Sequence, residues 1–575
     1  MERKPRMATT TTSSNLTKRE TYERTRAELL LERSTFESHW RECGDFILPR
    51  RTRFFVSDKN KGDRRSQKII DSTATFAVRT LRSGMHAGIS SPARPWMRLT
   101  TPDPELAEYG PVKDWLHTVT NRMLTVFLKS NLYNVLPMTY GDMAVFGTAA
   151  MCVEEDADDL FRCYSYPIGS YALGVSERQI VDTCVREWTM TVRQLVQTFG
   201  RIPGTDTIDW SNISAAVQRK WDRGEYEQNI EVCWIICPNP DHDPSKLGAQ
   251  FKAWGSYHFE KGTEQENKFL RESGFDEFPI LAPRWDVTGE DIYGTASPGM
   301  DSLGDIKALQ IMQKRKAQAV EKMVNPPLQG PTALKSQKVS MLPGDMTYVD
   351  VLQAQHGIRP IHEISLSVAD ITNDIRETQY RINESFFVNL FLMLASSDAQ
   401  DTQRTAREID ERHEEKLLML GPVLERTNDE LLDPLVDRVY AIMDRAGMIP
   451  PAPPDLEGVD LKVEYISLMA QAQKLVGVAG LDRFFASTVP LMEAFPEVKF
   501  KINAMQSVDD YGDMLGVNPK MIVPDDEAEA AEQQMEQAMA QQRQAELAAT
   551  TAKGAKDLSQ TDLETDNALR RMVEG

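Results

Sequence analysis

Two long helical stretches separated by a short insert limit the folds open to this chain more than any other feature of its sequence. In the first stretch, Asp301–Val324, apolar residues recur at helical spacing. Asn325-Pro326-Pro327 then ends the helix, because a residue that precedes proline is disfavoured in the helical region. A second stretch of the same kind covers Ser365–Phe387. Residues 326–364 between them carry Pro and Gly punctuation and predict strand or loop.

The composition is that of a globular protein with more than one domain. The chain has 575 residues, and 66 Lys+Arg against 86 Asp+Glu give a formal net charge of −20. This balance argues against a protein that grips DNA over its whole surface, but it allows a local basic patch. Six Cys residues without a dense pattern favour a reducing compartment and no disulfide framework. The longest apolar run, Phe386–Ala395, is too short to span a membrane.

The first half of the chain predicts a mixed α/β region. Thr17–Glu20 has the pattern of a capping box and predicts a helix that runs to about Cys43. Asp71 or Ser72 is expected to cap the next helix, and a further helix is expected to start at Pro111. One apolar face is predicted for the helix after Ser72, made of Ala74, Ala77, Val78, Leu81 and Met85. Short alternating runs between Asp142 and Pro283 predict strands. The runs are Ile230–Cys237 and Gln250–Phe259.

The last third of the chain predicts further helices. A long helix is expected over 402–446, with kinks or breaks at Pro422 and Pro434 and an end at Gly447. A Pro-rich linker then precedes further helical sequence, and the end of the chain is rich in Ala, Gln and acidic residues.

Motifs of catalysis and metal binding are missing from the sequence. It contains no GxxxxGK[ST] phosphate loop and no GxSxG, HExxH or EF-hand pattern. Cys233, Cys237 and His242 are conceivable zinc ligands, but both Cys residues fall on one face of an expected strand, which favours a structural role. We therefore predict no enzymatic activity, no cofactor and no metal.

The order of these elements, with four stretches of sequence, resembles a known family. The stretches are LLLERSTFESHWRECGDFILPR, SQKIIDSTATFAVRTLRSGMHAGISSPARPWMRLT, GEDIYGTASPGMDSLGDIKALQIMQ with the NPP that follows, and RTAREIDERHEEKL. Together they resemble the portal protein (head-to-tail connector) of short-tailed, podovirus-type bacteriophages, over roughly residues 20–530. The resemblance implies a helix-dominated α+β portal fold with wing, stem, clip and crown, assembling as a ring.

The resemblance also implies how the chain is divided. The expected parts are a disordered basic arm (1–20), a mixed α/β wing (21–295), stem helix 1 (296–325), the clip (326–364), stem helix 2 (365–387), the tunnel loop (388–401), a long kinked helix returning to the wing (402–447), a helical wing and crown region (448–530) and an acidic tail (531–575).

In function, the resemblance implies a homododecameric ring at one capsid vertex, through which double-stranded DNA passes non-specifically during packaging and ejection. The expected partners are the terminase motor, then the head–tail adaptor and tail proteins, together with capsid and scaffolding proteins. The expected location is the virion, and the host cytoplasm during assembly, with no membrane. Alternatives are another structural virion protein, such as a tail or adaptor component, and a cytosolic enzyme without recognisable motifs.

Candidate site residues follow from this division. Five basic residues are candidates for contact with DNA in the channel, with subunit salt bridges or solvation as alternatives: Lys314, Arg315, Lys316, Arg376 and Arg381. Lys335 and Lys338 are candidates for partner docking at the clip. The candidate tunnel-loop residues are Asn389, Ser396, Ser397, Asp398 and Gln400. The apolar segment Phe387–Leu394 is expected to be buried core rather than channel lining.

Overall fold

The computed structural model describes most of the chain up to residue 467. The described residues are 17–54, 65–202, 204–205, 207–263, 267–326, 328–329, 359–360, 368–395, 420–456, 458–467 and short stretches between 484 and 550. They fall into two compact units. The first consists of Met1–Met97, Asn121–Ile449 and Ser467–Ala470, and the second of Arg98–Thr120, Pro450–Ile466 and Gln471–Gly575.

The first unit opens with a long helix, α1 (Lys18–Phe46). The Thr17 hydroxyl accepts a hydrogen bond from the Glu20 N–H, and the Glu20 carboxylate accepts one from the Thr17 N–H at 2.8 Å. This reciprocal pair satisfies donors that a helix start otherwise leaves open. The predicted capping box is therefore confirmed.

A five-stranded antiparallel sheet in the order β4-β5-β6-β7-β8 lies against α1. Its strands are Tyr171–Val175, Val181–Thr191, Asn229–Pro238, Trp254–Glu260 and Arg271–Phe275. Tyr22 of α1 packs with Cys233 and Tyr257 in a buried cluster, and Cys237 joins the same cluster. The structural role expected of the two cysteines on one strand face is confirmed.

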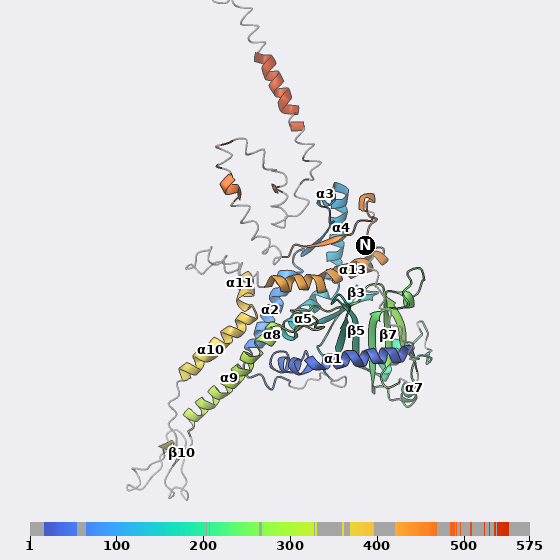
Figure 1. The fold of residues 1–575 in the computed structure, drawn as a ribbon, viewed down its shortest axis with the longest axis vertical. Helices are drawn as coiled ribbons and strands as arrows, with labels where there is room; N and C mark the ends of the chain where they lie inside the picture. Colours follow the sequence, from blue (N-terminus) through green and yellow to red (C-terminus); the bar gives the residue numbers. More distant parts are fainter. Residues whose placement is uncertain are drawn as a thin grey trace, which may run out of the picture. The chain divides into compact units, whose positions relative to one another are not determined.

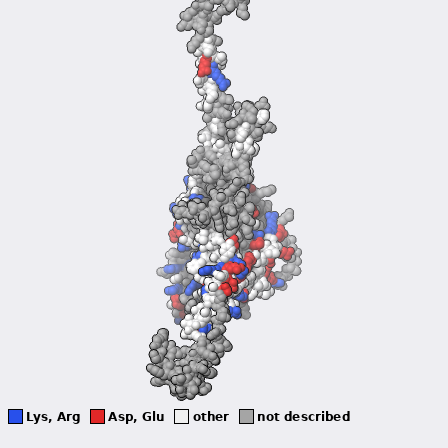
Figure 2. All heavy atoms as spheres, turned by 90° about the vertical axis from the view of Figure 1, so that its left-hand side faces the viewer, with Lys and Arg blue, Asp and Glu red and all other residues white. Residues whose placement is uncertain are grey.

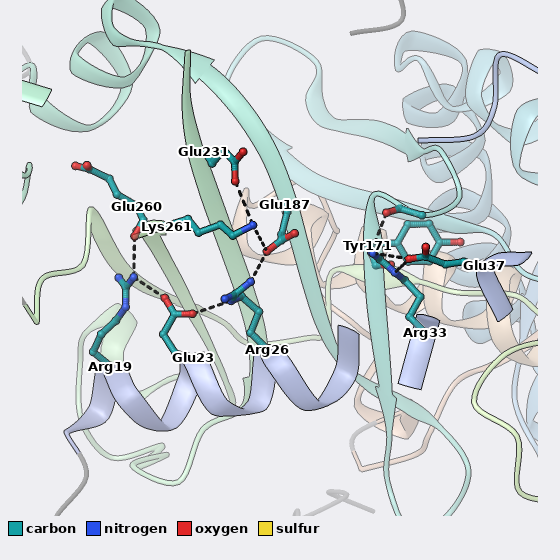
Figure 3. Close-up of polar contacts among 11 residues, drawn as sticks. Arg19, Glu23, Arg26, Arg33, Glu37, Tyr171, Glu187, Glu231, Glu260 and Lys261 are labelled. Carbon is teal, nitrogen blue, oxygen red and sulfur yellow. Dashed lines mark hydrogen bonds and ion pairs between the residues drawn. The ribbon is translucent and has the colours of Figure 1, made fainter. Parts of the chain in front are cut away.

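Charged side chains reinforce the contact between α1 and the sheet (Figure 3). Arg19, whose side chain is fully buried, donates to the Glu260 carbonyl and to Glu23. Arg26 bridges Glu23 and Glu187 at 2.7 and 2.6 Å. These contacts fix α1 along its length, because buried arginines need several acceptors to offset their desolvation.

Helical turns cover one end of the opposite sheet face. They are α6 (Val192–Leu195), the π-helical turn Val196–Gly200 and α7 (Ala215–Asp222). Helix α7 was not predicted from the sequence, although Ser214 caps it. The predicted strand Gln250–Phe259 is wrong over its first residues, where Ala249–Phe251 form a 3-10 turn after Gly248 at φ +139°.

A second, three-stranded sheet has the order β3-β2-β9, with strands Leu160–Tyr166, Ala150–Asp156 and Ile280–Leu281. Helices α2 (Thr73–Ile89) and α5 (Leu132–Phe146) pack together beside it. The apolar face predicted for α2 is buried throughout. Its members are Ala74, Ala77, Val78, Leu81 and Met85.

The remaining helices of this unit follow the second sheet along the chain. They are α8 (Pro298–Asp301), α9 (Leu303–Val324), α10 (Val368–Ser385), α11 (Val388–Ala395) and α13 (Asp433–Arg445). A π-helical turn, Asn428–Leu432, precedes α13 and Pro434 lies in the first turn of α13, so the predicted irregularity there is confirmed. Gly447 ends the helix at φ +68°.

The second unit is smaller. From Arg98 on, it contains β1 (Met97–Thr100), which pairs with β12 (Lys462–Tyr465), then α3 (Pro104–Glu108) and the start of α4 (Gly110–Lys129). Arg98 and Glu464 join the two strands by an ion pair of 2.7 Å. No helix in the described part of either unit is long and apolar enough to cross a membrane.

Candidate functional site on helices α9, α10 and α11

Helices α9 and α10 form an antiparallel pair (Figure 1). Arg381 reaches Asp305 at 3.3 Å, and the Thr378 hydroxyl reaches the Met312 sulfur at 3.9 Å, so the pairing runs in opposite directions along the two helices. Beyond their ends, the short strands β10 (Leu328–Gln329) and β11 (Arg359–Pro360) pair antiparallel. The predicted helix–insert–helix layout is therefore present in the structure.

A polar hub at Asp71 fixes the helix pair to the start of α2. The Gln310 side-chain oxygen accepts the Ile70 and Asp71 N–H groups at 2.6 and 2.7 Å. Gln313 of α9 and Gln379 of α10 both donate to the Asp71 carboxylate, at 2.8 and 2.9 Å. One carboxylate thus joins three helices.

The hub also perturbs Asp71 itself. Burial raises the pKa of this carboxyl, but hydrogen bonds from Thr73, Gln313 and Gln379 outweigh burial, so the pKa lies below its ordinary value. Asp71, rather than Ser72, accepts the Thr73 N–H at the start of α2. Gln310 was not predicted as a site residue, although a glutamine among the buried apolar positions of α9 indicates a polar contact there.

Helix α11 begins after Phe387, which has φ +54°. Phe391 packs directly on Gly84 of α2, and Leu390 and Phe391 are buried. The expectation that the apolar run is core is confirmed for these residues, whereas Leu392 is exposed. The expectation of a loop over 388–401 is wrong for its first eight residues, because apolar contacts with α2 hold them in a helix.

The insert-proximal half of α9 carries an open groove. It is lined by Gln313, Lys316, Ala317, Val320, Glu321, Val324 and Asn325. Val320 and Val324 are 40% and 72% exposed. In the first half of α9, the same face of the helix is buried and carries Ile306, Leu309 and Gln310.

The candidate channel residues take different positions. Lys314, Arg315 and Arg376 are exposed, and Lys316 lines the groove; none of these four forms a hydrogen bond or ion pair with the described residues. Arg381 instead pairs with Asp305. Consecutive residues of a helix project about 100° apart, so Lys314, Arg315 and Lys316 do not share one face. Figure 2 shows basic and acidic side chains interspersed on the side of the molecule that it presents.

The other candidate residues are described only in part. Asn389 lies in α11, where its side chain donates to Glu384 of α10 at 3.3 Å. The remaining candidates lie outside the described residues. They are Lys335, Lys338, Ser396, Ser397, Asp398 and Gln400.

A further pair of buried arginines holds the last helix of this unit. Arg284 is bound in a forked arrangement by Glu430, with contacts down to 2.6 Å. Arg438 of α13 donates to the Val153 carbonyl of β2 at 2.8 Å and to Glu277. These contacts attach the segment after the α9–α10–α11 group to the second sheet.

Comparison with known proteins decides the family. A profile of the family described as bacteriophage head to tail connecting protein matches residues 19–523. The chain belongs to this family. A connector of this kind is a structural component of the phage particle, and neither the family's description nor the names of its relatives indicates a catalytic role.

Two relatives of this connector are named as portal proteins. It is 48% identical over 544 residues to the portal protein of Salmonella phage epsilon15, covering 94% of this chain and 96% of the relative. It is 43% identical over 542 residues to the probable portal protein of Bordetella phage BPP-1, covering 94% and 95%. The predicted resemblance to portal proteins of short-tailed phages is confirmed.

The matches to solved structures are weaker than the matches to these two sequences. The virion of a native gene transfer agent particle matches at a TM-score of 0.34 and 9% identity, over 78% of this chain and 90% of that chain. The neck of an empty gene transfer agent particle matches at 0.31 and 10%, with the same coverage. Similarity at this level carries no argument about the fold.

Proposed function

We propose that copies of this chain close into a dodecameric ring at one capsid vertex and form the channel for genome packaging and ejection. The observation that carries the proposal is membership of the connector family over residues 19–523, together with the antiparallel pair α9 and α10 that brackets the insert. The ring surrounds double-stranded DNA without reading its sequence. The ring resides in the virion and assembles in the host cytoplasm.

The parts of the chain take the roles of a portal subunit. Residues 21–295 form the wing, 296–325 and 365–387 the stem, 326–364 the clip and 388–401 the tunnel segment. Residues 402–447 return to the wing, and the contacts of Arg284 and Arg438 described above support this. Residues 448–530 complete the wing and form the crown. The remaining two parts are the arm, residues 1–20, and the tail, residues 531–575.

Copies meet through the two stem helices. Helix α9 carries five basic and two acidic residues, and α10 carries two basic and four acidic residues. A head-to-tail contact that places α9 of one copy beside α10 of the next therefore pairs opposite charges, and such heterologous contacts close into a ring. Ile311 on α9 and Tyr380 on α10, 51% and 60% exposed, gain apolar cover in the same contact.

The charged residues of this contact are arranged in rows. Arg315 and Lys322 share one side of α9 with the exposed Ile311, since the three are four and seven residues apart. Asp370, Asp374 and Glu377 share one side of α10, since they are four and three residues apart. The two rows are the proposed contact between neighbouring copies.

The ring acts as a conduit rather than a motor. The sequence has no phosphate loop, so the terminase supplies the force and docks at the clip, where Lys335 and Lys338 contact it or the later tail adaptor. Capsid and scaffolding proteins surround the wing. Lys314, Lys316 and Arg376 touch passing phosphates, and the six acidic residues that α9 and α10 also carry prevent DNA from being held tightly.

Charge reversal tests the ring contact. The double variant R315E/K322E makes the α9 row acidic, and D374K/E377K makes the α10 row basic. Each variant alone repels its own copies, so we expect each to remain unassembled in light scattering. An equimolar mixture is expected to form rings in which the two variants alternate, because every contact is then complementary.

The chain carrying all four substitutions provides the matched control. It restores complementarity within one sequence, and we expect it to assemble alone. Rings formed by either double variant alone, at wild-type yield, would contradict the proposed contact. If those rings also packaged DNA poorly, the α9 row would belong to the channel lining instead.

A further inference from the structure

Helix α9 changes its surroundings at the Asp71 hub. No residue of α9 after Gln310 is buried, although the helix continues well beyond it. In α10, residues 368–374 are likewise exposed or half-buried, and burial begins at Ile375. We call residues 314–324 and 368–374 the distal arm. It is the part of the helix pair that leads to the insert.

Polar contacts hold the first half of α9 in place. Lys307 meets Glu42 at 3.0 Å, and Asp305 meets Arg381 at 3.3 Å. The side chains of residues 314–324, in contrast, form no hydrogen bond or ion pair with the described residues. A helical segment as short as this is marginal in water unless it packs against another element. The α9 part of the distal arm therefore needs cover from elsewhere.

Apolar side chains are exposed on opposite sides of α9. Ile311 is 51% exposed on the side proposed above to meet a neighbouring copy. Val320 and Val324, which line the groove, lie about 180° and 220° further round the helix. A helix with apolar groups on opposite sides is normally covered on both. A closed ring gives such cover, because each subunit has a neighbour on either side.

Charge indicates the chemistry of the partner that covers the distal arm. Its α9 part carries four basic residues and one acidic residue, and none of the four forms an ion pair with the described residues. Its α10 part carries Asp370 and Asp374 and no basic residue. The distal arms of two copies are therefore complementary in charge. DNA would supply negative charge but no apolar cover for Val320 and Val324, so a second copy fits better.

We propose that neighbouring copies hold the distal arm in its helical form, with the groove on α9 covered by the distal arm of an adjacent copy. The proposal rests on the ring proposed above, because the described residues of a single subunit leave the groove open. In the unassembled subunit, the stable part of α9 ends near the Asp71 hub. Because the insert joins the ends of the two helices, only a ring then offers the insert's partner a complete docking surface.

Hydrogen exchange measured by mass spectrometry on the full-length chain tests this coupling. The unassembled subunit and the ring are separated by size-exclusion chromatography and compared. We expect the backbone amides of residues 314–324 to exchange about tenfold or more slowly in the ring than in the subunit. The amides of residues 303–310 are the internal control and are expected to exchange equally slowly in both.

Two substitutions in the groove separate assembly from folding. V320S/V324S removes the apolar groups, and serine and valine have similar helix propensities. We expect the melting temperature of the unassembled chain to stay unchanged, because the groove is uncovered there. The protein concentration at which half the chains are in rings is expected to rise about tenfold or more, because apolar burial is lost. L309S, on the buried half of α9, is the matched control and should lower the melting temperature of the unassembled chain.

Two results would overturn the proposal while leaving the ring intact. Slow exchange of residues 314–324 in the unassembled subunit, with a lower melting temperature for V320S/V324S, would mean that the chain's own insert covers the groove. Rings in which these amides exchange as fast as in the subunit would leave the groove to a partner outside the ring. A chain that forms no rings at all would contradict the proposed function itself, and this proposal with it.

Discussion

At the scale of single residues, Gly84 decides whether α11 can lie on α2. A Cβ at this position would stand 2.2 Å from two ring carbons of Phe391 and 2.6 Å from its Cβ. The base of the Phe391 side chain cannot yield without moving the backbone of α11. The close approach of these two helices therefore requires glycine here.

Replacing this glycine is expected to destabilise the chain. In G84A the overlap with Phe391 costs up to about 3 kcal/mol, more than the roughly 1 kcal/mol that alanine contributes to a helix. Thermal melting of the unassembled chain measures the difference. G304A in α9, where no atom lies within 4 Å of the added Cβ, is the matched control and should melt at the wild-type temperature or above. Equal melting of G84A and wild type would show that α11 does not pack on α2.

Asp71 makes the attachment of the helix pair dependent on pH. Its pKa in the folded chain is lowered, so its contribution to stability is complete above the unfolded value of about 3.9 and is lost as pH falls through the folded value. D71N cannot titrate. We expect the difference in melting temperature between wild type and D71N to shrink between pH 5 and pH 3.

The glutamine donors provide the control for this prediction. Q379L removes one of the hydrogen bonds that lower the pKa of Asp71, and it should reduce the pH-dependent difference without abolishing it. A difference between wild type and D71N that is constant from pH 7 to pH 3 would mean that the hub does not stabilise the ionised carboxylate.

The burial and the partners of single charged residues could not be predicted from the sequence. Arg19, Arg284 and Arg438 are buried, yet nothing in their local sequence separates them from exposed arginines. Apart from Glu23 beside Arg19, their acceptors are far along the chain, such as Glu430 for Arg284. Such pairs depend on tertiary contacts, which a local pattern does not contain.

At the scale of elements, the pair Arg284–Glu430 attaches the helical segment before α13 to the strand region. The side chains are 5% and 19% exposed, and Glu430 also accepts the Arg284 backbone N–H at 2.8 Å. Breaking a buried pair leaves an uncompensated charge, which is the reason for its large effect.

A double-mutant cycle measures this attachment. R284M or E430Q alone is expected to destabilise the chain by about 3–5 kcal/mol, and the double variant by less than the sum. The exposed pair Arg24–Glu28, at 71% and 64% side-chain exposure, is the control and should contribute below about 0.5 kcal/mol. Additive effects at Arg284 and Glu430 in urea denaturation would count against the structural role assigned to the pair.

Periodicity and capping predicted the helices well. The Thr17 capping box and the apolar face of α2 were read directly from local sequence. Helix α11 was assigned to a loop because the family resemblance implies a tunnel loop over 388–401, and the contact of α11 with Gly84 is non-local. The basic trio Lys314–Lys316 was treated as one site, although neighbouring positions in a helix point in different directions.

At the scale of the whole molecule, element order carried more information than any single motif. The order of helices and insert pointed to the connector family, which the match over residues 19–523 shows. Sheet order was not predictable, because the pairing of β2 with β9 joins residues more than a hundred positions apart. The sequence predicted the helix–insert–helix region that holds the candidate site. Its attachment to α2 through Asp71 and Gln310 is visible only in the structure.

Electron cryo-microscopy of the purified protein shows directly whether its copies close into a ring. We expect rings with a central hole and twelve-fold symmetry, in which α9 and α10 of neighbouring copies stand beside each other around the axis. Compact particles without a hole, at concentrations that drive assembly, would contradict it. So would rings in which α9 and α10 point away from the axis and do not meet.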